Sequence, residues 1–154
     1  MRMKRSFTLL ETVVFLLSIA VISLVGAAAH RWMWEQAKLW SYRCAVQEIA
    51  TTMRQMRFRA VHAKRTFAMR IDAAAKRLQW VAMDTKPVVQ ESLERTIWLP
   101  DGLEIAQAPA RLTVLPTGEL PATSILLEAP VFQRLFRVRT GPGGIVQLNE
   151  EPST

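Results

Sequence analysis

The chain has 154 residues, which is enough for one membrane helix and one small globular domain. Its single cysteine, Cys44, excludes an internal disulfide, so a folded domain must be held together by packing alone. The net charge of +7 is unevenly divided, because residues 31–77 carry eleven Lys and Arg against three acids, whereas residues 78–154 carry six bases and nine acids. The basic character therefore belongs to the middle of the chain and not to its C-terminal half.

An apolar stretch from Phe7 to Ala29 dominates the start of the chain. From Thr12 to Ala29 there are eighteen residues without a charge. A helix rising about 1.5 Å per residue needs roughly 17 to 25 such residues to cross a bilayer. Three bases and no acid precede the stretch: Arg2, Lys4 and Arg5. The sequence therefore predicts a membrane-spanning helix with the short N-terminus in the cytoplasm and everything after Ala29 outside.

One acid, Glu11, lies within the apolar stretch. A carboxylate inside a membrane helix costs about 2.5 to 3.5 kcal/mol on insertion scales, so it is usually retained for a partner or a function. The plainer alternative is that Glu11 lies near the lipid headgroups. A rival for the whole stretch is a secretory signal peptide, for which residues 27–29 supply a small-residue cleavage site and His30 a new N-terminus. The length of the apolar run and the early acid favour the membrane helix.

The segment Lys4-Arg5-Ser6-Phe7-Thr8-Leu9-Leu10-Glu11 resembles the prepilin-type processing site of type IV pilins and type II secretion pseudopilins. The resemblance implies that a membrane-embedded prepilin peptidase cleaves between Ser6 and Phe7 and that Phe7 is then N-methylated. Ser6 stands where the family usually has Gly. The resemblance also implies an assembly role for Glu11, which would pair with the amino group of Phe7 on a neighbouring subunit, so that stacking of subunits compensates a buried charge.

A second helical segment follows the membrane stretch. Trp32, Trp34 and Trp40 come first, as expected for aromatic residues at the headgroup level, although Trp40 could equally pack on a globular domain. No Pro or Gly interrupts residues 35–61, and apolar residues recur at spacings of three and four to form one stripe: Val46, Ile49, Met53, Met56 and Ala60. The pattern predicts an amphipathic stem that continues the membrane helix to a total length of about 80 Å. Cys44 is expected to be a buried small residue, and much of the remaining surface is basic: Arg43, Arg54, Arg57 and Arg59.

After the stem the pattern changes to short strands. Residues 66–71 and 77–82 flank residues 72–76, which predicts a hairpin, although the alanines at 73–75 could instead prolong a helical turn. Residues 84–92 are predicted to be a polar connection. Further strands separated by Gly and Pro turns are predicted at residues 95–99, 103–106, 111–115, 124–128, 135–139 and 145–148. We expect antiparallel sheets that bury one face on the stem, followed by a frayed acidic tail.

The predicted fold class is therefore α+β, with a long N-terminal α-helix packed on a small antiparallel β-sheet domain. The expected parts are a leader peptide at residues 1–6, a transmembrane helix at 7–29, an amphipathic stem helix at 30–61, a β-rich globular domain at 62–148 and a tail at 149–154.

The second part of the chain resembles the GspH/FimT group of minor pseudopilins and minor type IV pilins. The resemblance rests on Met56-Arg57-Phe58-Arg59-Ala60-Val61, the hairpin after it, the turns Leu99-Pro100-Asp101-Gly102 and Leu115-Pro116-Thr117-Gly118, and a Gly-rich turn before the last strand. It implies a scarce subunit that initiates or caps a type II secretion pseudopilus near its tip. It also implies a single-pass protein of the bacterial inner membrane with a periplasmic C-terminal domain, whose partners are other pilin or pseudopilin subunits and the prepilin peptidase. A second hypothesis is that the distal domain recognises DNA or secreted cargo at the tip of the fibre.

No residue pattern indicates catalysis, a cofactor or a metal site. His30 and His62 are 32 residues apart, and neither has a Cys or a carboxylate at a metal-ligand spacing. Residues 140–144 are Gly-rich but lack the lysine and the following helix of a phosphate-binding loop. We therefore expect a structural protein without a cofactor and not an enzyme.

Nucleic-acid binding is the main alternative, because some FimT-like pilins are implicated in DNA uptake. Arg134, Arg137 and Arg139 form a small basic cluster. In a strand, Arg137 and Arg139 would share one face, where they could neutralise phosphates. A solvated strand face or a charged sheet edge also explains these residues. The acidic balance of the C-terminal half and the lack of an aromatic row beside the cluster favour the structural role.

Overall fold

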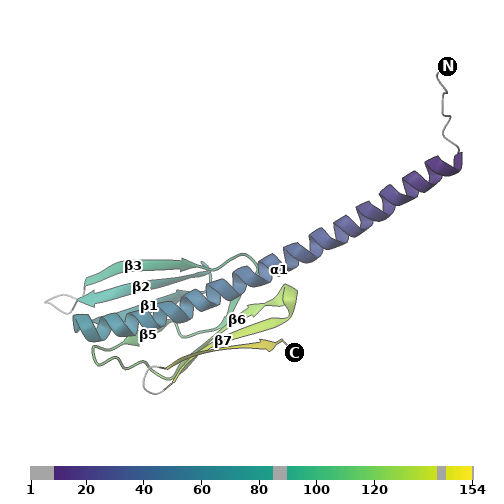
Figure 1. Cartoon of the computed structure of the whole chain (residues 1–154). Coiled ribbons are helices and arrows are strands. Elements are labelled where there is room, and N and C mark those ends of the chain that lie inside the picture. The colour runs from purple at the N-terminus through teal and green to yellow at the C-terminus, as the bar shows by residue number, and fades with distance from the viewer. Residues whose placement is uncertain (1–8, 85–89, 142–144, 154) are drawn as a thin grey trace. The chain divides into compact units, whose positions relative to one another are not determined.

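The computed structural model describes residues 9–84, 90–141 and 145–153. It begins with one uninterrupted helix, α1 (Leu9–Ala63). The chain divides into two compact units whose boundary follows Leu39, inside this helix. The first unit contains the N-terminal part of α1, and the second contains the rest of α1 together with all the strands (Figure 1). The predicted continuous helix is confirmed within the described residues.

Helix α1 ends in a left-handed cap without glycine. Lys64 has a φ angle of +51°, and the N–H of Arg65 donates to the carbonyl of Ala60 at 3.3 Å. This is the longer bond of a Schellman motif, which satisfies one of the last helical carbonyls. The chain is thereby reversed, and the first strand begins at Thr66.

The first sheet has the strand order β3-β2-β1-β5 (Figure 1). Its strands are β1 (Thr66–Asp72), β2 (Arg77–Asp84), β3 (Gln90–Trp98) and β5 (Arg111–Val114). Strands β1 and β2 form the predicted hairpin, from Thr66 opposite Met83 to Asp72 opposite Arg77. The carboxylate of Asp72 accepts the N–H of Ala75 and holds the turn.

Strand β3 begins earlier than predicted. Residues 84–92 were expected to be a connection, but Gln90, Glu91 and Ser92 pair with β2, and Asp84 itself ends β2. Residues 85–89 lie outside the described residues. Their neighbours were misassigned because a polar sequence is also compatible with an edge strand, which has one side open to water.

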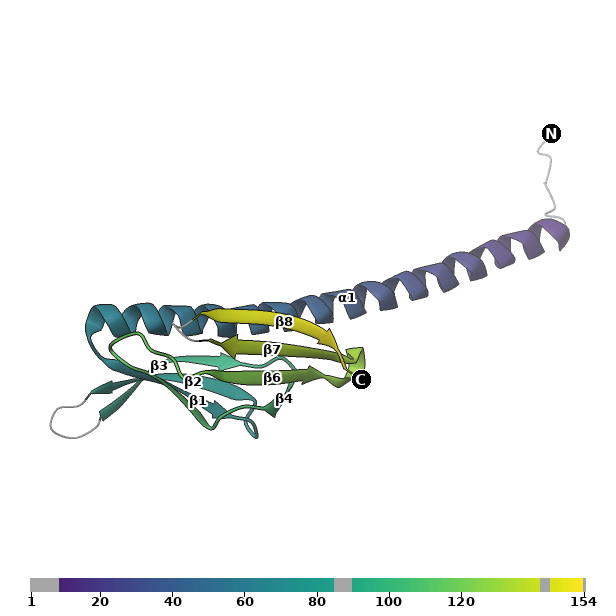
Figure 2. The same cartoon turned by 90° about the horizontal axis from the view of Figure 1, so that it is seen from below.

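The second sheet has the order β4-β6-β7-β8, and β8 lies beside the C-terminal part of α1 (Figure 2). Its strands are β4 (Glu104–Gln107), β6 (Thr123–Ala129), β7 (Arg134–Thr140) and β8 (Val146–Pro152). A short 3-10 helix, η1 (Pro130–Phe132), joins β6 to β7 and was not predicted. All neighbouring strands in both sheets are antiparallel, so the predicted α+β fold class is confirmed.

The predicted frayed tail is wrong for residues 149–152. Strand β8 continues to Pro152, which lies opposite Arg134, and the N–H of Ser153 donates to the carbonyl of Gln133 at 2.8 Å. Acidic residues at a chain end suggested disorder, but here they lie beside cations of α1 and β7. Glu150 contacts Arg43, and Glu151 contacts Arg137.

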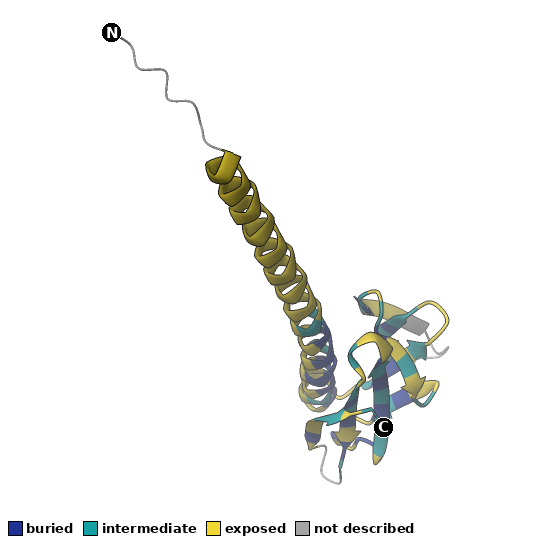
Figure 3. Ribbon diagram, turned by 90° about the vertical axis from the view of Figure 1, so that its right-hand side faces the viewer, coloured by how far each residue is buried: buried dark blue, intermediate teal, exposed yellow. Residues whose placement is uncertain are grey.

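The predicted apolar stripe of the stem forms the centre of the core. Its five residues are all fully buried in the second unit: Val46, Ile49, Met53, Met56 and Ala60. Both sheets contribute inward-facing residues to the same core, such as Met69 from β1 and Phe136 from β7. Figure 3 shows buried residues along the part of α1 that accompanies the strands and only exposed residues along its N-terminal part.

Cys44 is exposed, which corrects the expectation of a buried residue. Its neighbours Ala45 and Val46 are buried, but each residue turns about 100° around a helix axis. Cys44 therefore points away from the core although it lies within an apolar segment. It belongs to the outward face of the helix.

Candidate functional site

The first unit is an apolar helix with no cover of its own. Every residue from Leu9 to Lys38 is exposed, including the large apolar side chains of the predicted membrane segment. Among the described residues, α1 is the one helix that is long and apolar enough to cross a membrane. A surface of this kind is far larger than the apolar patches that soluble proteins leave in water.

The predicted processing and assembly residues lie at the start of this unit. Ser6 and Phe7 lie outside the described residues. Glu11 lies in the first turn of the described helix and is exposed in the single chain. Trp32, Trp34 and Trp40 are all exposed, so Trp40 does not enter the core.

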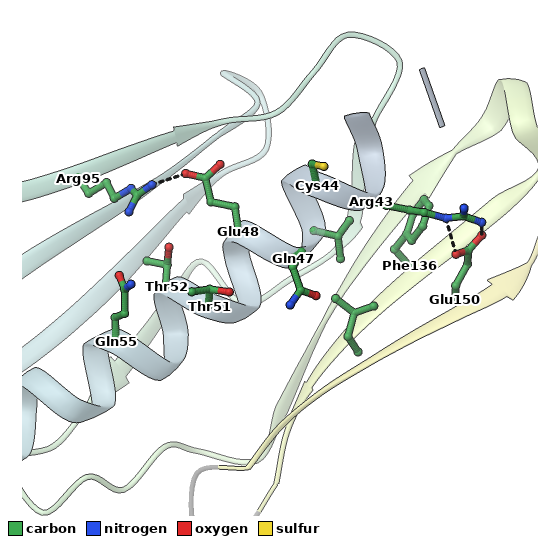
Figure 4. A pocket seen from close by; sticks show the side chains of 12 residues that line it. Arg43, Cys44, Gln47, Glu48, Thr51, Thr52, Gln55, Arg95, Phe136 and Glu150 are labelled. Atoms are coloured by element: carbon green, nitrogen blue, oxygen red, sulfur yellow. Dashed lines mark hydrogen bonds and ion pairs between the residues drawn. The ribbon is translucent and has the colours of Figure 1, made fainter. Parts of the chain in front are cut away.

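In the second unit, arginines of α1 hold the helix to both sheets. On one side, Arg43 makes two hydrogen bonds of 3.0 Å to the carboxylate of Glu150 in β8 (Figure 4). On the other side, Arg59 reaches Glu94 of β3 at 3.3 Å. Arg43 and Arg59 were predicted to lie on the surface of the helix. They do lie there, and each forms an ion pair with a carboxylate of a strand. Exposed pairs of this kind contribute about 0–1 kcal/mol each, so they orient the sheets more than they stabilise them.

Two further arginines of α1 donate to backbone carbonyls. Arg54 Nη2 donates to the carbonyl of Val146 at 3.1 Å, and Arg57 Nε donates to the carbonyl of Gly118 at 3.2 Å. No local sequence pattern predicts these contacts, because their partners are backbone groups 92 and 61 residues away.

The two Pro-containing turns predicted from the sequence, at residues 99–102 and 115–118, pack against α1. Gly118 has a φ angle of +81°, and a Cβ at this position would lie 2.8 Å from Val61 Cγ2. Gly102 has a φ angle of +88°, and a Cβ there would collide with the hydroxyl of Tyr42. That hydroxyl donates to the carbonyl of Asp101 at 2.8 Å. Both glycines are therefore required for the left-handed backbone and for close approach to α1.

The electrostatics of the interface follow from these contacts. Hydrogen bonds from Arg43 lower the pKa of Glu150, and the charges of Arg43 and Arg134 lower it further against the opposing effect of partial burial. Burial raises the pKa of the Tyr42 hydroxyl, and the nearby charge of Asp101 adds to this. At neutral pH Tyr42 is therefore a proton donor and Glu150 an anion.

Solved structures share this arrangement of helix and sheets. The minor pseudopilin EpsH from the type 2 secretion system of Vibrio cholerae superposes with a TM-score of 0.60 at 19% sequence identity, covering 71% of this chain and 96% of that chain. A crystal structure of the same pseudopilin gives a TM-score of 0.54 at 18% identity, covering 71% of this chain and 95% of that chain. The type IV minor pilin FimU of Pseudomonas aeruginosa gives 0.56 at 18% identity, covering 75% and 92%. No protein-family model and no curated protein matches the sequence.

The chain has the minor-pilin fold.

The predicted basic cluster lies on β7 of this minor-pilin fold and is partly neutralised. Arg134 lies 3.9 Å from a carboxylate oxygen of Glu150, and Arg137 lies 3.6 Å from one of Glu151. Arg139 is exposed on the same strand and lines a shallow hollow with Ser124 and Gln147. Across the three strands Arg139 lies opposite Ser124 and opposite Gln147. The cluster is thus two ion-paired arginines and one that faces neutral polar groups.

The two histidines belong to different units of the chain. His30 belongs to the first unit, and His62 lies near the end of α1, where its Nδ1 is 2.9 Å from the carbonyl of Phe58. Within residues 9–84, 90–141 and 145–153, no group of three or more His, Cys, Asp or Glu side chains has the geometry of a metal site.

Proposed function

We propose that the chain is a membrane-anchored structural subunit of a pilus or pseudopilus, and that its role is assembly and not catalysis. One observation carries the proposal: a domain with the minor-pilin fold is joined, through a single helix, to an exposed apolar segment that contains Glu11. The apolar segment is long enough to hold the subunit in a bilayer. A domain held in this way can be stored in the membrane and then added to a fibre.

The processing step rests on the resemblance of residues 4–11 to the prepilin-type site. We place cleavage between Ser6 and Phe7, on the cytoplasmic side of the inner membrane, and the domain in the periplasm. Mass spectrometry of the N-terminus of the mature protein tests this. A methylated Phe7 at the N-terminus supports the proposal, whereas a start at His30 would mean that a secretory signal peptide had been removed.

The assembly step rests on Glu11. In a fibre its carboxylate would meet the amino group of Phe7 on an adjacent subunit, so that two charges are compensated inside an apolar bundle. We expect Glu11→Ala to leave membrane insertion and cleavage intact and to reduce incorporation into fibres. Glu35→Ala is a matched control, because Glu35 is an exposed acid on the same helix that pairs with Arg31 at 3.1 Å. Normal incorporation of Glu11→Ala would refute the pairing role.

The specific form of the proposal is a minor pseudopilin of a type II secretion system that initiates or caps the fibre near its tip. The similarity of the fold to EpsH, a minor pseudopilin of such a system, supports this form. Quantitative mass spectrometry of purified fibres tests it. A few copies per fibre and loss of secretion on deletion are expected, whereas a copy number equal to that of the main fibre subunit would contradict a minor role.

The alternative is a FimT-like minor type IV pilin that binds DNA for uptake. Its basis in the structure is Arg139, since Arg134 and Arg137 already face carboxylates. Gel shifts of the full chain in detergent micelles, with double-stranded DNA at two salt concentrations, distinguish the forms. A salt-sensitive complex that Arg139→Ala weakens would favour DNA uptake, and the lack of such a complex would exclude it.

A further inference from the structure

Strand β8 is poorly buried for its length. Of its seven residues only Val146 is buried, whereas β6 and β7, which are equally long, bury three residues each. In the order β4-β6-β7-β8 it comes last, so among the described strands it pairs with β7 alone. Burial of apolar surface is the main force that holds a strand in a sheet, and β8 has little of it.

The row of β8 that points to the core shows the reason. Val146, Leu148 and Glu150 lie opposite buried residues of β7, and opposite residues on neighbouring strands point to the same face of a sheet. Leu148 is nevertheless 36% exposed, and Glu150 places a carboxylate where an apolar side chain would be expected. The core-facing row of β8 therefore contributes one fully enclosed side chain.

Ion pairs supply much of the attachment of β8 instead. Glu150 accepts two hydrogen bonds of 3.0 Å from Arg43 of α1 and lies 3.9 Å from Arg134 of β7. Glu151 lies 3.6 Å from Arg137 of β7. All five side chains are at least 24% exposed. Ion pairs between exposed groups are weak and are screened by salt, so the attachment of β8 depends on ionic strength.

Backbone contacts hold the two ends of β8. Near its start, Arg54 Nη2 of α1 donates to the carbonyl of Val146 at 3.1 Å. Just after its end, the N–H of Ser153 donates to the carbonyl of Gln133 at 2.8 Å. Each is a polar contact that water can replace once the strand moves away.

Strand β7 has support that does not involve β8. It pairs with β6 along its whole length. At its last residue, the hydroxyl of Thr140 donates to the carbonyl of Pro121 at 2.6 Å and accepts the N–H of Thr123 at 3.0 Å. These contacts fix the end of β7 from which the chain continues to β8. The release of β8 therefore leaves β4, β6 and β7 paired.

We propose that β8 is a strap that opens while the rest of the second unit stays folded, and that the ion pairs of Glu150 and Glu151 keep it closed. Opening uncovers one edge of β7, which then presents unpaired N–H and C=O groups. The strap thus determines whether the second sheet has a free edge on the side of α1. The proposal goes beyond assembly, because it concerns the second unit alone and does not depend on the membrane segment.

Hydrogen exchange of the full chain in detergent micelles, at constant pH, tests the proposal. The amides of β8 that bond to β7 should exchange at least about tenfold faster than the amides of β6, because exchange reports local opening. Raising the salt concentration from about 0.05 M to about 0.5 M should speed exchange in β8 by about threefold and leave β1 unchanged. Equal exchange rates in β8 and β6 would mean that β8 is released only by unfolding of the whole unit, which would overturn the proposal.

An arginine variant tests the role of charge. Arg43→Ala should speed exchange in β8 several-fold, with no change in β1 and β2, and should reduce the effect of salt on β8. Arg31→Ala is a matched control, because Arg31 lies on the same helix and pairs at 3.1 Å with Glu35, far from any strand in sequence. It should leave exchange in β8 unchanged. Faster exchange throughout the second unit of Arg43→Ala would show that the ion pair supports the whole fold and not a strap.

A disulfide across the two strands provides the converse experiment. Arg139 and Gln147 lie opposite each other on β7 and β8, and both are exposed. In a Cys44→Ser chain, Arg139→Cys with Gln147→Cys should form a disulfide that slows exchange in β8 to the rate of β6, and reduction should restore the fast rate. Fast exchange that persists in the oxidised form would contradict the proposal. None of these measurements involves processing or fibre assembly, so their failure would leave the proposed function standing.

Discussion

The two parts of α1 differ in what surrounds them and not in their helical structure. From Leu9 to Lys38 every side chain is exposed, whereas from Tyr42 to Ala60 one face is buried and its borders are ion-paired to strands. In the second part the sheets complete the environment of the helix within the same chain. In the first part the environment has to come from lipid or from other helices. Apolar residues of α1 therefore stabilise the fold between Tyr42 and Ala60. Between Leu9 and Lys38 they indicate contact with lipid or with other helices.

The largest expected contrast compares two isoleucines of α1. Ile49 is fully buried and Ile19 is 45% exposed. Ile49→Ala should lower the free energy of unfolding of the β-rich unit by about 2–5 kcal/mol, through lost burial and a residual cavity. Ile19→Ala should change it by less than about 0.5 kcal/mol. Urea unfolding of the full chain in detergent micelles, followed by near-UV circular dichroism, measures both. Equal losses would mean that the two parts do not differ in the way described.

Two glycines sharpen the same contrast. Gly118→Ala should destabilise the β-rich unit by about 1–2 kcal/mol from its left-handed backbone alone, with a further loss because the new Cβ crowds Val61. Gly26→Ala has no heavy atom within 4 Å of its new Cβ and should leave that unit unchanged. Urea midpoints of the two variants provide the comparison, and a stable Gly118→Ala protein would show that the turn can move away from the helix.

A smaller effect is expected where α1 meets the first Pro-containing turn. Tyr42→Phe removes the hydrogen bond to the carbonyl of Asp101 and leaves the ring in place. The expected loss is about 0.5–1.5 kcal/mol. Thermal unfolding measures it, with Tyr42→Leu as a second variant that also removes the edge-to-face contact with Phe132. If Tyr42→Phe is as stable as the natural chain, water replaces the tyrosine as donor.

The smallest expected effect is on the stability of the β-rich unit at low pH. The pKa of Glu150 is lowered in the folded chain, so its contribution to stability is complete above the unfolded value of about 4.3 and is lost as the pH falls through the lower folded value. Because both partners are partly exposed, the contribution is about 0.2–1 kcal/mol. Arg43→Ala should remove most of this part of the pH dependence below about pH 4.3 and leave the smaller contribution of Arg134, as measured by urea unfolding across that range. An unchanged slope would show that the ion pair does not couple protonation to folding.

Local patterns in the sequence were sufficient for the helix and the hairpin. The stripe from Val46 to Ala60 and the alternation around residues 72–76 depend on neighbours a few positions apart, and both were predicted. Gln90–Ser92 and Asn149–Pro152 were misassigned because their strands exist through pairing with distant segments. The prediction that Cys44 is buried was wrong because it relied on the apolar residues around Cys44 and not on the angular position of Cys44 around the helix axis. Within the candidate site, residues 6–11 could be named from a local motif. The contacts of Arg43 and Arg54 could not be predicted, because they join residues that are 107 and 92 positions apart in the sequence.

The contact between Arg43 and Glu150 also bears on how the domain is made. It joins one of the first residues of the second unit to one of its last, and strand β8 supplies part of the cover over Phe136. A native state closed by contacts so remote along the chain has a high contact order and folds only after both segments are available. The domain therefore cannot reach its native state before synthesis has passed Glu150.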